Sequence, residues 1–224
     1  MNPSQSPTKR LFFALEIGHT QRDLAARSQS RLVEAYPNTR LRLTAPQDLH
    51  VTLLFLGDQP AEALQNLISI GEQIASLFDS FSLKLTDIGA FPDVSAPHVF
   101  WLGVQEDKER TASKLSRELR RSAAAPLTDT MPFKPHLTLA RVPARIPREV
   151  AAAARELLKG DNPHSDDASR VIKVARFVLM ETLPVGTHTN PGESRYNTVH
   201  SFLLQKPRAI HTPAVNTQTE KVGN

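Results

Sequence analysis

The chain has 224 residues, 40% of them hydrophobic and 22% charged, which is typical of one large globular domain or of two closely packed lobes. It contains no cysteine, which excludes disulfides and thiolate metal sites and suits a reducing compartment. The net charge of +4 is compatible with a phosphate-bearing partner but does not identify one.

Polar segments flank a long region that has the apolar periodicity of regular structure. We expect residues 1–9 to be a flexible leader, residues 10–206 to form a single domain, and residues 207–224 to be disordered. In chain order, the apolar pattern predicts a strand at 10–17, a helix at 20–36, strands at 39–43 and 49–57, a helix at 60–78, strands at 81–91 and 98–104, a helix at 106–125, a strand at 134–142, a helix at 147–159, and β-prone segments at 171–183 and 195–204. Strands and helices are interleaved twice, which indicates a duplicated unit.

Two of the predicted strands contain the same arrangement of a histidine and a threonine. The stretches LHVTLLFLG (49–57) and FKPHLTLAR (133–141) both contain the frame H-x-T-L, although the chain has only eight histidines. Each half of the predicted duplication carries one copy. A single histidine on a strand is usually structural, whereas two in matching frames favour a functional role.

Strand alternation predicts where these side chains lie. Residues two apart share a face and lie roughly 6.6 Å apart. His50 and Thr52 should therefore share one face, and His136 and Thr138 should share one face of the other strand. The same alternation places a set of neighbours on the opposite, packed faces: Val51, Leu53 and Phe55 on the first strand, Leu137 and Leu139 on the second.

Two imidazoles and two hydroxyls in one cleft suit chemistry at a phosphorus atom. Near neutral pH, one imidazole can accept a proton from water while another donates a proton to a departing alkoxide. Hydroxyl donors can stabilise the charge that accumulates on the non-bridging oxygens. This scheme requires no metal ion and no nucleophilic serine or cysteine.

The stretches HVTL (50–53) and HLTL (136–139) resemble the two signature motifs of the two-histidine phosphoesterase superfamily. More narrowly, the chain resembles the RNA 2',3'-cyclic phosphodiesterases, also called 2'-5' RNA ligases. Further matching stretches follow in family order: RLFFA (10–14), FLG (55–57), GAFP (89–92), WLGV (101–104), FKPHLTLAR (133–141) and FVLME (177–181). The resemblance covers about residues 10–204.

The resemblance implies a bilobed α+β fold of duplicated β-α-β-type units, with antiparallel sheets that meet at a central cleft and helices outside. It implies hydrolysis of 2',3'-cyclic phosphate ends to a 2'-phosphate, without a metal or other cofactor. His50 would donate a proton to the leaving O3', His136 would activate water, and Thr52 and Thr138 would hold the phosphate. The expected partners are RNA 3' ends or nucleotides that carry a 2',3'-cyclic phosphate. We expect a cytoplasmic monomer that has no membrane contact.

Other side chains are candidates for contacts with substrate. Arg141 is a candidate phosphate ligand, although alternation places it on the face opposite His136 unless the strand bends. Phe12, Phe55 and Trp101 could stack on a nucleobase, with core packing favoured for Phe55 and Trp101. The remaining candidates are Gly192 and Tyr196, where relatives place a glycine and then a tyrosine, Arg117, Arg120 and Arg121 on a helix face that we interpret as solvated, and His98, His188 and His200, which we interpret as structural.

Three functions remain open at this stage. The first is the metal-free cyclic phosphodiesterase. The second is a binding module that retains the cleft for RNA ends or nucleotides without turnover. The third is a metal-dependent hydrolase, which is disfavoured because no carboxylate stands at ligand spacing beside either histidine.

Overall fold

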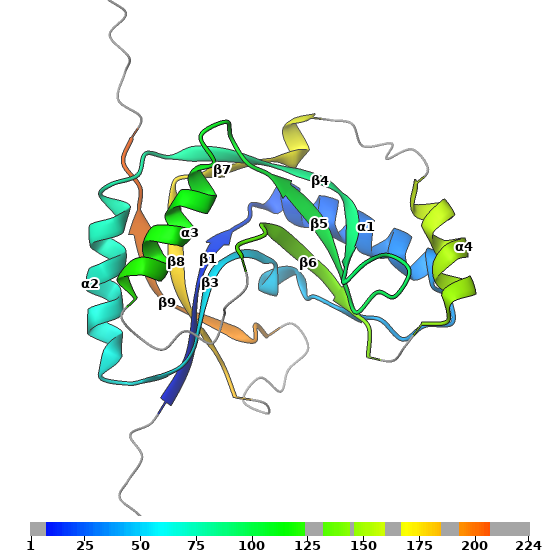
Figure 1. Cartoon of the computed structure of the whole chain (residues 1–224), viewed down its shortest axis with the longest axis horizontal. Coiled ribbons are helices and arrows are strands. Elements are labelled where there is room, and N and C mark those ends of the chain that lie inside the picture. Colours follow the sequence, from blue (N-terminus) through cyan, green and yellow to red (C-terminus); the bar gives the residue numbers. More distant parts are fainter. Residues whose placement is uncertain (1–7, 124–131, 144–145, 160–166, 185–192, 207–224) are drawn as a thin grey trace, which may run out of the picture.

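The structure is a computed structural model that describes residues 8–123, 132–143, 146–159, 167–184 and 193–206 (Figure 1). In these ranges the elements are β1 (Thr8–Glu16), α1 (His19–Ala35), β2 (Arg42–Leu43), a 3-10 turn (Pro46–Asp48), β3 (His50–Pro60), α2 (Ala63–Ala75), β4 (Phe81–Phe91), β5 (Val99–Gln105), α3 (Thr111–Ser122), β6 (His136–Arg141), α4 (Arg148–Lys159), a second 3-10 turn (Asp167–Arg170), β7 (Val171–Val174), β8 (Arg176–Thr182) and β9 (Tyr196–Leu203). Strand β1 begins two residues earlier than predicted. The rest of the predicted leader and the predicted tail lie outside the described residues.

All these strands belong to one antiparallel sheet with the order β7-β4-β5-β6-β3-β1-β8-β9, and β2 pairs with β6. The sheet divides at its centre, because β3 and β6 are joined by the single pair Val51–Leu137. We call the strands β3, β1, β8 and β9 the β3 half, and the strands β6, β5, β4 and β7 the β6 half. The α+β fold with antiparallel sheets from two halves, expected from the resemblance, is confirmed.

The two halves have the same internal order. Counting outward from the centre, β3, β1, β8 and β9 correspond to β6, β5, β4 and β7. Val51 and Leu137 are both the middle residue of an H-x-T motif, so the pair that joins the halves also joins equivalent positions. This arrangement agrees with the duplicated unit that the sequence predicts.

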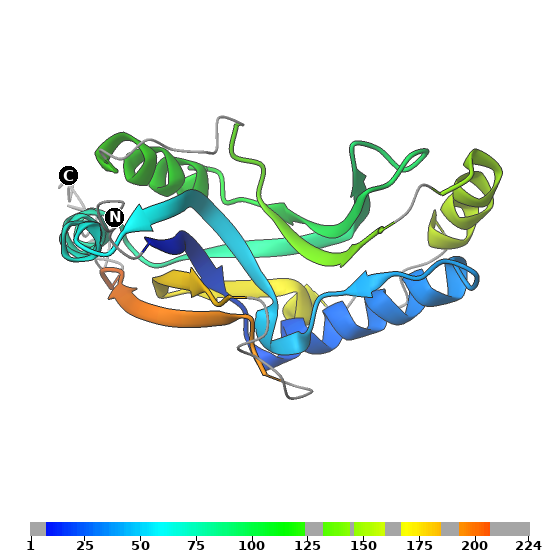
Figure 2. The same cartoon turned by 90° about the horizontal axis from the view of Figure 1, so that it is seen from below.

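Each half is packed against a helix that follows a strand of the other half. Helix α1 follows β1 but contacts β6 and α4, whereas α3 follows β5 but contacts β3 and α2. Figures 1 and 2 show the result, with α2 and α3 at one end of the molecule and α1 and α4 at the other. The exchange ties the halves together although their direct strand pairing is short.

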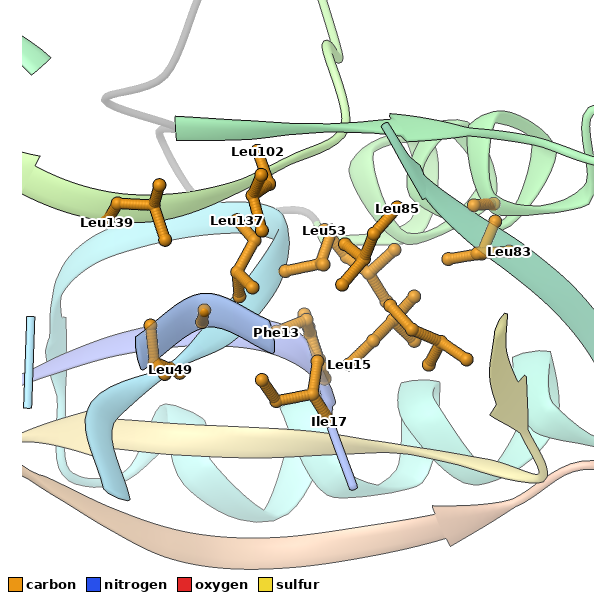
Figure 3. Close-up of a cluster of buried hydrophobic side chains, with 14 of the residues drawn as sticks. Phe13, Leu15, Ile17, Leu49, Leu53, Leu83, Leu85, Leu102, Leu137 and Leu139 are labelled. Carbon is orange, nitrogen blue, oxygen red and sulfur yellow. The ribbon is translucent and has the colours of Figure 1, made fainter. Parts of the chain in front are cut away.

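Apolar side chains on one face of the strands form a continuous core. Figure 3 shows leucines of both halves pointing into one cluster, with Leu102 and Leu137 from the β6 half and Phe13 and Leu53 from the β3 half. Each of these four side chains is at most 2% exposed. Burial of such side chains stabilises the fold by about 1.5–3 kcal/mol each, and it fixes the strands that carry the polar residues of the opposite face.

The segment 171–183, predicted as one β-prone stretch, is divided between the two halves. Strand β7 pairs with β4, and β8 pairs with β1, with a break at Ala175. The backbone oxygen of Ala175 accepts a hydrogen bond from Leu204 N at 2.9 Å. Alternation could not predict the break, because the apolar pattern continues through it on both sides.

Candidate active site

Each histidine strand contains one extra residue after the threonine of its motif. In the β3 half, Ala14 pairs with Thr52 and the next residue towards the start of β1, Phe13, pairs with Leu54, so that Leu53 has no partner in β1. This is the pattern of a β-bulge, in which two residues of one strand oppose one residue of its neighbour.

The β6 half repeats the bulge at the equivalent position. Trp101 pairs with Thr138 and Phe100 pairs with Ala140, so that Leu139 has no partner in β5. From the histidine onward, the two strands also share one burial pattern: half-buried, buried, half-buried, buried, buried, exposed. The duplication therefore extends to an irregularity that no regular strand would show.

Because of the bulge, the fifth residue after each histidine lies on the same face of the strand as the histidine and the threonine. These residues are Phe55 in β3 and Arg141 in β6, and both are exposed. The sequence predictions that Phe55 packs in the core and that Arg141 faces away from His136 are therefore wrong. Simple alternation assigns successive residues to opposite faces, whereas a bulge inserts one extra residue and so reverses the assignment of the residues that follow it. Phe55 is 46% exposed, which makes it available to a ligand.

Each bulge accepts a hydrogen bond from a buried polar side chain on the helix that packs against it, which is α3 for β3 and α1 for β6. Ser116 of α3 donates its hydroxyl to Leu53 O at 2.7 Å, and Gln29 of α1 donates Nε2–H to Leu139 O at 2.9 Å. Ser116 is 1% exposed and Gln29 is 7% exposed. Sequence reasoning did not find these two residues, because a serine or a glutamine within a helix carries no signal of a partner 63 or 110 residues away.

The pair between the halves brings the two motifs together. Since β3 and β6 are antiparallel and Val51 lies opposite Leu137, His50 falls opposite Thr138 and Thr52 falls opposite His136. The charge of His136 acts on His50, which agrees with this proximity. The structure therefore brings together the four motif residues that the sequence singles out.

Both histidines have the same tautomer. Nδ1 of His50 lies 2.7 Å from Asp48 O, and Nδ1 of His136 lies 2.7 Å from Lys134 O. A carbonyl oxygen only accepts hydrogen bonds, so Nδ1 carries a proton in each ring. Nε2 is then the nitrogen that can gain or lose a proton in both residues.

Burial lowers the pKa of His50 below its ordinary value, and nearby charges modify that effect. The carbonyl and the carboxylate of Asp48 act in the opposite direction, while His136 and Arg195 lower the pKa further. Asp48 is 3% exposed, and its carboxylate accepts hydrogen bonds from Ser194 Oγ at 2.8 Å, Arg195 N at 3.0 Å and Arg195 Nε at 3.2 Å. A buried carboxylate therefore stands beside His50.

Burial also lowers the pKa of His136, but the charges around this ring are positive. The hydrogen bond to Lys134 O raises the pKa, whereas the cations of Lys134 and Arg141 lower it. The Lys134 ammonium group lies 4.8 Å from the centre of the Phe91 ring. The two histidines thus have equivalent backbone partners and different charges, since a carboxylate acts on His50 and cations act on His136.

Aromatic rings enclose both histidines. The rings of Phe12 and Tyr196 have their centres 5.0 and 5.1 Å from that of His50, and the Phe91 ring lies 5.0 Å from that of His136. Phe12 is only 2% exposed, so it packs against His50 and offers little surface to a base. Trp101 is half-buried, but it pairs with Thr138 and its ring lies 6.4 Å from that of His136, so it lies on the face of the motif and not in the core that the sequence favoured.

Phe55 lines two hollows formed by described residues, and Thr52 and His136 line the larger one. The larger, about 900 Å³, is lined among others by Thr52, Phe55, Phe91, Phe133, Lys134 and His136; we call it the aromatic cleft. The smaller, about 510 Å³, is lined by Arg10, Leu11, Phe12, Phe55, Gly57, Arg141, Thr182 and Tyr196; we call it the arginine hollow. The aromatic cleft therefore combines stacking surfaces with the cations of Lys134 and Arg120, whereas the arginine hollow contains Arg10 and Arg141.

The helix arginines divide between solvent and the site. Arg117 and Arg121 are exposed, and Arg121 pairs with Glu118 at 2.7 Å. These two agree with the solvated face that the sequence predicts. Arg120 is half-buried and lines the aromatic cleft, so the prediction is wrong for this residue.

The other histidines have separate surroundings. His98 is exposed and lines the aromatic cleft, a position that the sequence pattern did not predict. His200 Nε2 lies 2.8 Å from Glu72 Oε1, away from both motifs. His188 and Gly192 lie outside the described residues.

The described residues contain neither a cluster of metal ligands nor a membrane-spanning helix. No group of three or more His, Cys, Asp or Glu side chains in this part of the chain is arranged to hold a metal ion. None of the helices there is long and apolar enough to cross a membrane.

Comparison with known proteins gives consistent matches over most of the chain. The family model described as the 2'-5' RNA ligase superfamily matches residues 21–183. The RNA 2',3'-cyclic phosphodiesterase of Archaeoglobus fulgidus is 33% identical over 177 residues, which cover 78% of this chain and 91% of that protein. The protein of the same name from Thermus thermophilus is 33% identical over 144 residues, which cover 62% of this chain and 71% of that protein.

Solved structures show the same fold. A protein of Thermus thermophilus superposes with a TM-score of 0.65 and 26% identity, covering 89% of this chain and all of that one. Escherichia coli LigT complexed with 3'-AMP superposes with a TM-score of 0.64 and 25% identity, with the same coverage. Sequence motifs, family match and fold agree, and the chain belongs to the 2'-5' RNA ligase superfamily.

Proposed function

We propose that the protein hydrolyses RNA or nucleotide 2',3'-cyclic phosphate ends to 2'-phosphates by metal-independent acid–base catalysis with two histidines. The names of its relatives support this substrate class. The observation that carries the mechanism is the convergence of His50, Thr52, His136 and Thr138 across the Val51–Leu137 pair.

In the proposed reaction, a water molecule attacks phosphorus while the bond from phosphorus to O3' breaks. Nε2 of His136 takes a proton from the water, and Nε2–H of His50 gives a proton to O3', so the enzyme returns to its starting state after one proton exchange with solvent. Thr52 and Thr138 donate hydrogen bonds to the non-bridging oxygens, on which charge accumulates.

The surrounding charges support this division of roles. Burial lowers the pKa of both rings, but at His50 the Asp48 carboxylate opposes this effect and favours the protonated form that a proton donor needs. Lys134 and Arg141 favour the neutral form of His136, which is the form that a proton acceptor needs. The family resemblance implies the same division of roles.

Arg141 is the proposed cationic ligand of the reacting phosphate. The bulge places it on the face of His136 and Thr138, its charge acts on His136, and it lines the arginine hollow. A guanidinium group can donate two parallel hydrogen bonds to a phosphate. We also propose that residues 10–206 act as one domain, because a single cluster of buried apolar side chains includes both halves.

The test is hydrolysis of adenosine 2',3'-cyclic phosphate in the presence of EDTA. His50→Ala and His136→Ala should each lower the rate by about 10²- to 10⁴-fold, the usual contribution of a general acid or base. His200→Ala is the matched control, since this histidine contacts Glu72 and lines neither hollow. Tight binding without turnover would instead indicate an RNA-end binding module, and loss of activity with EDTA would indicate a metal-dependent hydrolase.

A second substrate separates the two roles. An aryl phosphodiester has a leaving group that needs no protonation, so His50→Ala should lose much less activity towards it than towards the cyclic nucleotide. His136→Ala should lose activity towards both substrates, because water must be deprotonated in either reaction. Equal losses in both variants would contradict the assignment.

A further inference from the structure

The arginine hollow contains two cations that have no partner in the described part of the chain. Arg10 of β1 and Arg141 of β6 both line it and both are exposed. Neither side chain makes a hydrogen bond or an ion pair with a described residue. By contrast, the neighbouring Lys9 is paired with Glu181 at 2.7 Å. Two unpaired guanidinium groups in one concave site favour an anionic ligand.

The hollow adjoins the proposed proton donor. Phe12 and Tyr196 form part of its wall, and both rings also contact His50. Arg141 is the inner cation, since its charge acts on His136. Arg10 precedes Phe12 by two residues on β1, which is a displacement of roughly 6.6 Å along the strand. Arg10 is thus available to an anion beyond the one that reacts.

The chemistry of an RNA end supplies such an anion. The ribose that carries the cyclic phosphate has two other substituents, the base on C1' and the 5' phosphodiester that leads to the preceding nucleotide. The aromatic cleft, with Phe55, Phe91 and Phe133, suits a base. The arginine hollow, with its cations, suits the phosphodiester.

We propose that the arginine hollow binds the phosphodiester on the 5' side of the terminal nucleotide, with Arg10 as its main ligand. This inference rests on the proposed function and extends it to the substrate class. The protein then selects chains of two or more nucleotides over nucleoside 2',3'-cyclic phosphates. Phe55, which lines both hollows, separates the base from the phosphodiester.

The test compares two substrates that differ only in the upstream nucleotide: adenosine 2',3'-cyclic phosphate and the dinucleotide ApA with a 2',3'-cyclic phosphate end. The ratio of their kcat/KM values should favour the dinucleotide by about ten- to a hundredfold, which corresponds to hydrogen bonds with a charged group. Arg10→Gln should reduce this ratio to within about threefold of one. The control Arg27→Gln removes the same charge from an exposed position of α1 outside both hollows and should leave the ratio unchanged.

A wild-type ratio near one, or a ratio that Arg10→Gln leaves unchanged, would overturn the proposal. Binding provides a readout that does not depend on turnover. The dissociation constants of adenosine 2'-phosphate and of ApA with a 2'-phosphate end should show the same ratio and the same loss in Arg10→Gln. If neither substrate is hydrolysed but the binding ratio behaves as expected, the proposed reaction fails and the phosphodiester site stands. If the cyclic phosphates are hydrolysed but both product ligands bind equally well, the proposed reaction stands and the phosphodiester site fails.

Discussion

Replacement of Ser116 by alanine tests whether the bulge in β3 is held by helix α3. The hydroxyl is 1% exposed and donates to Leu53 O at 2.7 Å. The variant leaves that buried carbonyl without its donor, which costs about 1–3 kcal/mol. In a protein of this size, 1 kcal/mol lowers the midpoint of thermal unfolding by about 2–4 °C. Ser116→Ala should therefore lower the midpoint by about 2–12 °C.

The same variant should also affect activity, because the bulge sets the positions of Thr52 and Phe55. We expect kcat/KM for a cyclic nucleotide to fall at 25 °C, where the variant is still folded. Differential scanning calorimetry gives the midpoint, and a hydrolysis assay on the same sample gives the rate.

The matched control is Ser76→Ala. Its hydroxyl donates to Gln73 O at the same distance, 2.7 Å, but this serine is exposed at the end of α2. Surface substitutions of this kind usually change stability by less than about 0.5 kcal/mol. Equal midpoints for the two variants, or full activity in Ser116→Ala, would refute the reasoning that the bulge depends on this bond.

Four further predictions concern the site. Because the folded-state pKa values of His50 and His136 lie below the ordinary value, kcat/KM should peak on the acid side of about pH 6.5, and a flat profile from pH 5 to 9 would contradict the paired roles. Below about pH 6.5, His50 and His136 bind more protons in the unfolded chain than in the folded protein, so the free energy of unfolding should fall as the pH drops through the folded-state pKa values. In thermal melts, replacing both histidines by glutamine should reduce this fall. Asp48→Asn removes the carboxylate that favours protonated His50, so the basic limb of the pH–rate profile should move to lower pH; an unmoved limb would assign that limb to another group. Phe55→Ala should raise KM for the cyclic nucleotide by about 5- to 150-fold, the value of one stacked base, and an unchanged KM would exclude stacking on this ring.

The sequence predicted the fold class and the convergence of the motif residues because these depend on regular features. The two H-x-T frames show which face of each strand is polar, and their positions in the two halves show that the faces can meet. Periodicity located the helices and most of the strands for the same reason. The element bounds agree with the structure to within a few residues wherever an element is regular.

The sequence could not predict the bulges. Leu53 and Leu54 are both apolar, as are Leu139 and Ala140, so each pair satisfies either a regular strand or a bulged one. The position of Phe55 depends on which of the two forms. The structure resolves this through Ser116 and Gln29, whose bonds join residues that are far apart in the chain.

The surroundings of His50 were also out of reach of sequence reasoning. Asp48 precedes the strand in a turn, where an aspartate is common for local reasons. Its actual partners, Ser194 and Arg195, lie 146 and 147 residues away. Tyr196 was a candidate base contact, whereas the structure places its ring against His50 and Phe12. Only the folded chain shows that this segment completes the surroundings of the proposed proton donor.

Phosphorus NMR of the product tests most directly whether both imidazoles act on one phosphorus atom. With adenosine 2',3'-cyclic phosphate and EDTA, we predict a single new resonance, that of the 2'-phosphate, because His50 protonates O3' as water adds from the side of His136. Formation of the 3'-phosphate, of a mixture of both isomers, or of no product would contradict the account.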